Sequence, residues 1–309
     1  MKISVVGAGQ VGGQAAFLAM RSGLGDVVLF DVNDGLAQGK ALDIGQSMAI
    51  ISGAAEVCGG ADWSLTEGSD IIVVTAGLAR RPGMNRQDLL TANGTIVTRV
   101  VREALRWSPD ALVIVVTNPI NTMTYLAYKA SGLPPERVFG MAGILDNARL
   151  TYFISRELAV PVTDIVSWVI GDHGDHLVPV LSQTRVDRQR LTNRASPTQL
   201  ERISARTRNA GTEILNHLRE GSAYFAPGAA ICKMLSAIAR SEPAPMPCSV
   251  YLQGEYGVRD VMAGVPAVLG RDGVKEIVEL ELASDEYRQF AAAVAHIRER
   301  NAFALPLLL

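Results

Sequence analysis

Three glycines near the start of the chain constrain its fold more than any other feature. The apolar run Ile3–Val6 leads directly into Gly7, Gly9 and Gly12, spaced Gly-x-Gly-x-x-Gly, and a helix-like stretch covers Val11–Arg21. A glycine turn between a strand and a helix lets the backbone approach a ligand, and the helix N-terminus then offers free N–H groups and a positive dipole end. This arrangement predicts a phosphate-binding turn of the dinucleotide type.

An acidic residue strengthens the prediction. Asp31 ends the second apolar run, Val27–Phe30, about 20 residues beyond Gly12. A carboxylate at that place accepts hydrogen bonds from ribose hydroxyls and repels a 2′-phosphate, so it favours NAD over NADP. The alternative is that Asp31 only caps a turn or helix. With the strand, glycines and acid in register, we expect NAD binding, with Gln10 and Val11 joining the glycines around the phosphates.

The first half of the chain alternates strand-like and helix-like segments. Two runs rich in Val and Ile, Asp70–Gly77 and Ala111–Pro119, flank a helix-length stretch at Asn93–Trp107, and another helical segment covers Leu36–Ile50. Continuous β-branched runs separated by helices indicate parallel strands buried on both faces. The right-handed crossover rule then predicts a Rossmann-type, doubly wound α/β sheet.

The pattern changes after Gly143. Asp164–Gly171 is strand-like, and Met246–Gly270 is turn-rich and typical of antiparallel strands. Longer helical stretches surround them, namely Leu145–Ala159, Thr198–Leu218, Ala223–Arg240 and Asp285–Arg300. We therefore expect an NAD-binding domain at residues 1–143 and a second, α+β substrate domain at residues 144–309.

Charge excludes two classes of partner. The 29 basic and 31 acidic residues give a formal charge of −2, so no global basic field favours nucleic acid or an anionic membrane. The short basic stretch Arg185–Arg194 is typical of a solvated loop. No apolar run approaches the roughly 20 residues that span a bilayer, and the apolar tail Ala304–Leu309 is expected to pack on the body or on a neighbouring subunit.

The remaining composition favours a cytoplasmic protein. The three cysteines, Cys58, Cys232 and Cys248, are far apart and lack metal-ligand spacing, so we expect no metal site and neutral or buried thiols in a reducing compartment. The first residues lack the layout of a signal peptide, because a glycine turn arrives at once.

Three residues indicate acid–base chemistry on an anionic substrate. His173 lies between glycines in Gly171–Asp175, just after the predicted strand, whereas His217 and His296 lie on polar-flanked helical stretches and are expected to be solvated. Asp146 and Arg149 are three residues apart on one helix face. They form either a simple surface ion pair or a catalytic set in which Asp146 orients His173 and Arg149 binds a carboxylate.

A charged loop completes the candidate site. Leu78–Leu89 follows a strand and carries three arginines, a Pro-Gly pair and an asparagine. This composition is typical of a lid over an active site, although an ordinary solvated loop is the alternative.

At these residues the chain closely resembles the lactate/malate dehydrogenase family, most of all the bacterial malate dehydrogenases built on the lactate dehydrogenase plan. The resemblance covers nearly the whole chain. It is carried, in order, by GAGQVG, TAGLARRPGMNRQDLL, VVTNPIN, GILDNAR, GDHGDHLVPV, GSAYFAPGAA and GVPAVLG. So many motifs in one order make a specific match.

The resemblance implies a role for each candidate. It makes His173 the proton donor and acceptor, paired with Asp146, and Arg149 the ligand of the carboxylate beside the reacting carbon. It implies that Arg86 polarises the substrate carbonyl when the lid closes, and that Asn118 contacts substrate and cofactor.

The resemblance also implies the cofactor and the reaction. Asn93 and the backbone of Val116, Thr117 and Asn118 line the nicotinamide side of an NAD site. The implied reaction is the reversible, NAD-dependent oxidation of (S)-malate to oxaloacetate, a step of the tricarboxylic acid cycle. The implied partners are a small dicarboxylate and further copies of the chain, in a homodimer or homotetramer.

Arg80 occupies the lid position that distinguishes family members, which carry Gln there for lactate and Arg for malate. An arginine facing the second carboxylate of oxaloacetate makes a charge-assisted pair worth roughly 1.5–3 kcal/mol, whereas it is left unpaired against a methyl group. The spacing to Pro82-Gly83 and Arg86 favours Arg80, although a register slip onto Arg81 stays open. Ala223, where lactate dehydrogenases carry Thr, leaves room for the larger substrate.

The sequence leaves two alternative functions open. The chain could be a lactate or other 2-hydroxyacid dehydrogenase, or an NAD-binding sensor without activity; the intact set of His173, Asp146, Arg149 and Arg86 argues against the sensor. Asp172 departs from the family pattern, which has Gly or Glu before the histidine. Its carboxylate either raises the pKa of His173 or faces solvent.

Overall fold

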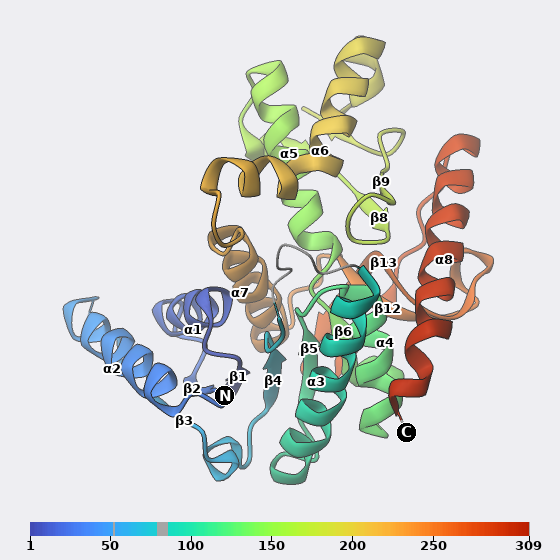
Figure 1. The fold of residues 1–309 in the computed structure, drawn as a ribbon. Helices are drawn as coiled ribbons and strands as arrows, with labels where there is room; N and C mark the ends of the chain where they lie inside the picture. The colour runs from blue at the N-terminus through green and yellow to red at the C-terminus, as the bar shows by residue number, and fades with distance from the viewer. Residues whose placement is uncertain (52, 79–85, 309) are drawn as a thin grey trace.

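One mixed sheet runs through both halves of the chain (Figure 1). The structure is a computed structural model that describes residues 1–51, 53–78 and 86–308, without the side chain of Arg86. The strand order in this sheet is β3-β2-β1-β4-β5-β6-β12-β13-β8-β9, and β14 also pairs with β13. The expectation of a Rossmann sheet followed by an α+β second half is confirmed.

The N-terminal part of the sheet is parallel throughout. Its strands are β1 (Lys2–Val6), β2 (Asp26–Phe30), β3 (Val57–Gly60), β4 (Ile71–Val74), β5 (Leu112–Val115) and β6 (Val138–Gly140). Alternate side chains enter different cores: Ile71 and Val73 belong to one cluster, Ile72 and Val74 to the other. Burial on both faces explains why these strands are continuous apolar runs.

Helices cover both faces of the parallel strands. These are α1 (Gln10–Arg21), α2 (Asp34–Ile51), α3 (Arg86–Trp107) and α4 (Ile120–Ser131). Residues of α1 and α2 share one core with α7 (Phe225–Arg240), and residues of α3 and α4 share the other. Figure 1 shows α1 and α2 together at one side of the sheet and α3 and α4 together at the other.

The C-terminal part of the sheet is antiparallel. Strand β12 (Met246–Gln253) pairs with β13 (Arg259–Gly270) and joins the parallel part through Ser249 opposite Gly140. The other strands there are β8 (Val169–Gly171), β9 (Leu177–Pro179) and β14 (Gly273–Ile277). The expected antiparallel strands within Met246–Gly270 are therefore confirmed.

The prediction of one strand over Asp164–Gly171 is wrong. It divides into β7 (Ile165–Val166) and β8, and β7 belongs to a separate small sheet with β10 (Arg185–Val186) and β11 (Gln189–Arg190). The chain leaves one sheet for the other at Ser167, which is buried. Its hydroxyl bonds the Asn147 side chain, at 3.0 Å, and the Thr151 hydroxyl, at 2.7 Å, which anchors this crossing point to α5 (Gly143–Leu158).

The remaining helices surround the second half of the sheet. They are α5 (Gly143–Leu158), α6 (Pro197–Leu218) and α8 (Ser284–Ala304). Short 3₁₀ turns cover Trp63–Thr66, Pro135–Arg137, Val162–Asp164, Leu191–Asn193, Glu255–Gly257 and Leu305–Leu308. The last turn confirms that the apolar tail packs on the body, because Leu307 and Leu308 contact the core formed by α3 and α4. Among the described residues, no helix is long and apolar enough to cross a membrane.

Close contact between β3 and α2 depends on Gly59. A Cβ atom on Gly59, in β3, would lie 2.2 Å from the carbonyl oxygen of Ala37, in α2. In contrast, a Cβ atom on Gly39, which lies in α2, would meet no atom within 4 Å. We predict that Gly59→Ala destabilises the protein by about 1–3 kcal/mol, because α2 must move away from the strand. Gly39→Ala should be neutral or stabilise by up to about 1 kcal/mol, through better helix propensity.

Denaturant unfolding of the two variants beside the wild type measures this difference. Equal effects of the two alanines would contradict the close packing of α2 on β3.

Candidate active site

The glycine turn after β1 forms an open cradle at the N-terminus of α1. A Cβ atom on Gly12 would lie 2.0 Å from the carbonyl oxygen of Gly7, so this position admits only glycine. In contrast, a Cβ atom on Gly9 would meet nothing within 4 Å, because Gly9 faces open space. No side chain caps the helix at Gly9, so the N–H groups of Gln10 and Val11 begin the helix beside that space. The cradle fits a pyrophosphate.

Asp31, which follows β2, stabilises the glycine turn through hydrogen bonds. Its two carboxylate oxygens accept hydrogen bonds from the backbone N–H of Ala8, at 2.8 Å, and of Asn33, at 2.9 Å. The carboxylate thus does cap a turn, and its remaining lone pairs can accept the hydroxyls of a ribose. Sequence reasoning missed Lys40, whose Nζ donates to the Gly9 carbonyl at 2.9 Å. A basic residue on the next helix gave no signal for this contact.

Asn93, on α3, connects the segments that follow β4 and β5. Its side chain is buried, because Asn93 is 1% exposed. Its side chain accepts from the N–H of Leu78, at 2.7 Å, and donates to the carbonyl of Asn118, at 2.8 Å. The Thr117 hydroxyl donates to the carbonyl of Ala76, at 2.7 Å. Asn93 therefore holds together the two loops after β4 and β5. These loops, with the backbone of Val116–Asn118, would flank a nicotinamide.

His173, Asp146 and Arg149 form one connected group. The Asp146 carboxylate bonds His173 Nδ1 through one oxygen, at 2.7 Å, and Arg149 Nη1 through the other, at 3.2 Å. Asp146 itself is 1% exposed and lies in the first turn of α5, where the helix dipole favours a negative charge. The simple surface ion pair considered from the sequence is therefore wrong, because Asp146 is buried and is shared with the histidine.

Asp146 controls the proton affinity of His173. Burial lowers the pKa of the ring, but the charge of Asp146 and its hydrogen bond more than offset this effect, so the pKa of His173 lies above its ordinary value. Since Nδ1 is bonded to Asp146, Nε2 is the nitrogen left to exchange a proton with a ligand. Arg149 Nε is buried and makes no hydrogen bond to any described residue, as expected of a cation that awaits an anion.

Asn121 is a further site residue that sequence reasoning missed. It lies at the start of α4, is fully buried, and accepts a hydrogen bond from the backbone N–H of His173, at 3.2 Å. Its amide also donates to the Ser249 hydroxyl and to the Met262 carbonyl, each at 3.2 Å. Asn121 thereby ties the histidine loop to β12 and β13. The signal lay in the motif VVTNPIN, which ends at this residue.

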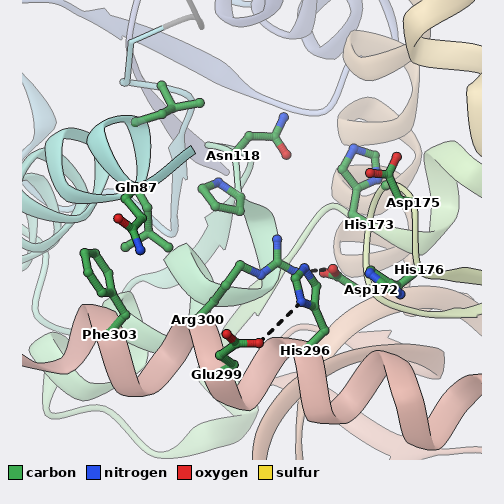
Figure 2. A pocket seen from close by; sticks show the side chains of 14 residues that line it. Gln87, Asn118, Asp172, His173, Asp175, His176, His296, Glu299, Arg300 and Phe303 are labelled. Carbon is green, nitrogen blue, oxygen red and sulfur yellow. Dashed lines mark hydrogen bonds and ion pairs between the residues drawn. The ribbon is translucent and has the colours of Figure 1, made fainter. Parts of the chain in front are cut away.

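A cavity of about 480 Å³ opens beside His173, between the start of α3 and helix α8 (Figure 2). Its wall includes Asn118, Asp172, His176, His296 and Arg300. His296 is partly exposed, and its ring also packs on that of His176, with centroids 4.3 Å apart, and lines the cavity.

Three arginines of the predicted lid have roles that depend on the family resemblance. Arg80 and Arg81 lie outside the described residues, as does the side chain of Arg86. Ala223 lies half-buried just before α7. The structure thus brings together His173, Asp146, Arg149 and Asn118, and it leaves the lid roles as predictions.

Comparison with known proteins identifies relatives along the whole chain. Residues 1–140 match the family model of the lactate/malate dehydrogenase NAD-binding domain, and residues 144–302 match that of its alpha/beta C-terminal domain. A malate dehydrogenase of Desulforudis audaxviator is 46% identical over 297 residues, 96% of each chain. One of Chlorobium luteolum is 43% identical over 99% of each chain.

Solved structures agree with the sequence matches. The malate dehydrogenase of Salinibacter ruber superposes with a TM-score of 0.95 at 40% identity, covering 99% of this chain and 98% of that one. A lactate dehydrogenase of Cryptosporidium parvum, complexed with lactic acid and nicotinamide adenine dinucleotide, also gives 0.95, at 37% identity over 98% and 97%.

The His173–Asp146 pair makes a pH prediction. We expect NMR titration of His173 to give a pKa above 6.5, and Asp146→Asn to lower that pKa, because the charge that stabilises the imidazolium is removed. The signal of the exposed His217 serves as the internal spectral reference in both proteins. An unchanged His173 pKa in Asp146→Asn would contradict the pairing.

The same pair affects stability. Since the folded pKa of His173 is raised, its contribution is fully present below about pH 6.5 and is lost as pH rises through the folded value. The difference in unfolding free energy between wild type and His173→Asn should therefore shrink across that window. A difference that grows with pH would contradict the sign of the shift.

Proposed function

The chain belongs to the lactate/malate dehydrogenase family, a family of NAD-dependent oxidoreductases, and from that premise we propose that it interconverts (S)-malate and oxaloacetate. The proposal is carried by the buried group of His173, Asp146 and Arg149 beside the cavity. Relatives named malate dehydrogenase, 43–46% identical over nearly the full length, support the choice of substrate.

Arg149 binds the carboxylate next to the reacting carbon. One of its Nη atoms is already held by Asp146, so the guanidinium is fixed in direction before a ligand arrives. A planar guanidinium can bind a carboxylate through two parallel hydrogen bonds, which sets the position and the tilt of the substrate. Asn118, at the end of β5 and on the cavity wall, contacts substrate and cofactor.

His173 moves the proton. In malate oxidation its neutral Nε2 accepts the proton of the substrate hydroxyl, while Asp146 stabilises the imidazolium that forms. In oxaloacetate reduction the protonated ring delivers the proton to the developing alkoxide. Bound NAD would supply the hydride acceptor for malate oxidation, and NADH would supply the hydride for oxaloacetate reduction. The raised pKa of His173 keeps the proton available for reduction at higher pH.

The residues that would hold NAD lie at the carboxyl ends of the parallel strands. Gly7, Gly9 and Gly12 would hold the pyrophosphate with the N–H groups of Gln10 and Val11, and Asp31 would hold the adenosine ribose. The open face of Gly9 supports this placement. Asn93 and the backbone of Val116, Thr117 and Asn118 flank the nicotinamide.

The lid supplies the remaining two cations. Arg86 polarises the substrate carbonyl, and Arg80 pairs with the second carboxylate and so selects the dicarboxylate over pyruvate or lactate. These roles rest on the motif that the family shares.

The surface of the protein carries exposed apolar side chains that would suit contact between subunits. Large apolar side chains are exposed on α2 and α7, among them Ile50 (85%), Leu42 (65%) and Phe225 (65%). Such surfaces support a homodimer or homotetramer. We propose that residues 1–143 bind NAD, that residues 144–309 bind substrate, and that the enzyme works in the cytoplasm.

A substrate panel tests the function. With NADH, purified protein should reduce oxaloacetate far better than pyruvate, and NADPH should be a poor substitute. Equal or better use of pyruvate would favour a lactate dehydrogenase. Binding of NADH without turnover of any 2-oxo acid would favour a sensor.

A single substitution tests the selector. Arg80→Gln should lower kcat/KM for oxaloacetate about 100-fold, because a charge-assisted pair worth roughly 1.5–3 kcal/mol is lost, and should spare or raise pyruvate use. Arg81→Gln is the matched control and should leave the ratio of the two substrates unchanged. If Arg81→Gln alone changes that ratio, the register is shifted by one residue. If neither does, the lid does not select.

A further inference from the structure

A second carboxylate lies next to the catalytic histidine in sequence. Asp172 immediately precedes His173, yet it is 4% exposed and does not face solvent. It forms an ion pair with Arg300, whose guanidinium projects from α8 on the cavity wall (Figure 2). The pair joins the histidine loop to a helix about 130 residues later in the chain.

Burial alone would make Asp172 unfavourable as an anion. Desolvation raises the pKa of this carboxyl above its ordinary value, and the charge of Arg300 and its hydrogen bond oppose that rise. A buried charge that loses its partner is strongly destabilising, so a cation facing Asp172 stabilises the ionised carboxylate and the folded protein. Arg300 is the cation in that position.

We propose, building on the function proposed above, that Arg300 is a positioning residue for proton transfer. Its ion pair with Asp172 fixes the loop that carries His173 against α8. It also offsets part of the charge of the second carboxylate, so that Asp146 remains the dominant anion beside His173. The departure from the family pattern at Asp172 is thus matched by a cation on α8.

Other charged groups face this region and act in parallel. Arg149 approaches from α5, His296 and Glu299 belong to α8, and His176 and Asp175 continue the histidine loop. The pKa of His296 is lowered by desolvation, then by Arg300 and His176. None of these groups changes in the variants below, so differences between variants report on the pair.

Removing one partner or the other should move the pKa of His173 in opposite directions. Arg300→Met leaves an uncompensated carboxylate beside the ring. The ordinary pKa of a histidine lies about 2.5 units above that of an aspartic acid. The nearby negative charge therefore favours protonation of His173, and the pKa of His173 rises. Asp172→Asn leaves Arg300 as an unpaired cation, and the pKa of His173 falls.

The experiment is a double-mutant cycle read by NMR titration of His173 in the cofactor-free protein, with His173→Asn identifying the signal. We expect Arg300→Met to raise the pKa and Asp172→Asn to lower it, each by on the order of one unit. The double variant should return close to the wild type. No shift in Arg300→Met, or shifts of the same sign in both single variants, would overturn the proposal.

Two further variants keep the test interpretable. Arg300→Lys keeps the positive charge, so the pKa of His173 should stay at its wild-type value even if Arg300→Met folds poorly. The double variant should also fold, because it leaves neither member of the pair as an unpaired buried charge. Arg298→Met is the matched control, because Arg298 lies on the same helix and donates to the carbonyl of Arg259, at 2.9 Å. A shift in Arg298→Met as large as in Arg300→Met would also overturn the proposal.

Kinetics connect the pair to the reaction. The acidic limb of kcat/KM for malate oxidation should move to higher pH in Arg300→Met and to lower pH in Asp172→Asn, by the shifts that NMR records. Titration shifts without matching kinetic shifts would overturn the role in proton transfer. Failure of wild-type turnover would contradict the proposed function instead, and the NMR cycle would still decide the role of the pair.

Discussion

The carboxylate of Asp146 is the interaction on which the candidate site depends. One oxygen bonds the ring of His173 and the other bonds the guanidinium of Arg149. A single buried anion therefore directs the proton-transferring group and the carboxylate-binding group at once. Removing one partner from such a buried set costs about 3–5 kcal/mol. The same anion raises the pKa of His173 against the effect of burial, so orientation and proton affinity have one cause.

The sheet makes this arrangement available. The glycine turn, Asp31 and Thr117 follow the ends of β1, β2 and β5, and ligands of open α/β sheets bind beyond such strand ends. The antiparallel strands continue the same sheet through β6 and β12, so the histidine loop after β8 belongs to the framework that carries the cofactor turn. Asn121 completes the connection by bonding the backbone of His173 and the residues of β12 and β13.

Sequence reasoning predicted most of this fold because the parallel strands are buried on both faces and show as continuous apolar runs. It missed β3, whose Val-Cys-Gly-Gly has little β-branched character, and the short β6, whose three residues are too few for a period to appear. It found His173, Asp146 and Arg149 from local motifs. It missed Arg300, which acts through a tertiary contact with the histidine loop that no local spacing encodes. It also missed the tertiary contact of Asn121, although that residue ends the motif VVTNPIN.

Proton uptake on ligand binding tests the central claim most directly. An unreactive 2-oxo dicarboxylate analogue should bind the NADH complex only when His173 is protonated, because the ring donates its Nε2 proton to the oxo group. Calorimetry in buffers of different ionisation enthalpy, at a pH well above the pKa of His173, should therefore record uptake approaching one proton per site in the wild type and almost none in His173→Asn. Tight binding by the wild type without proton uptake would contradict the account.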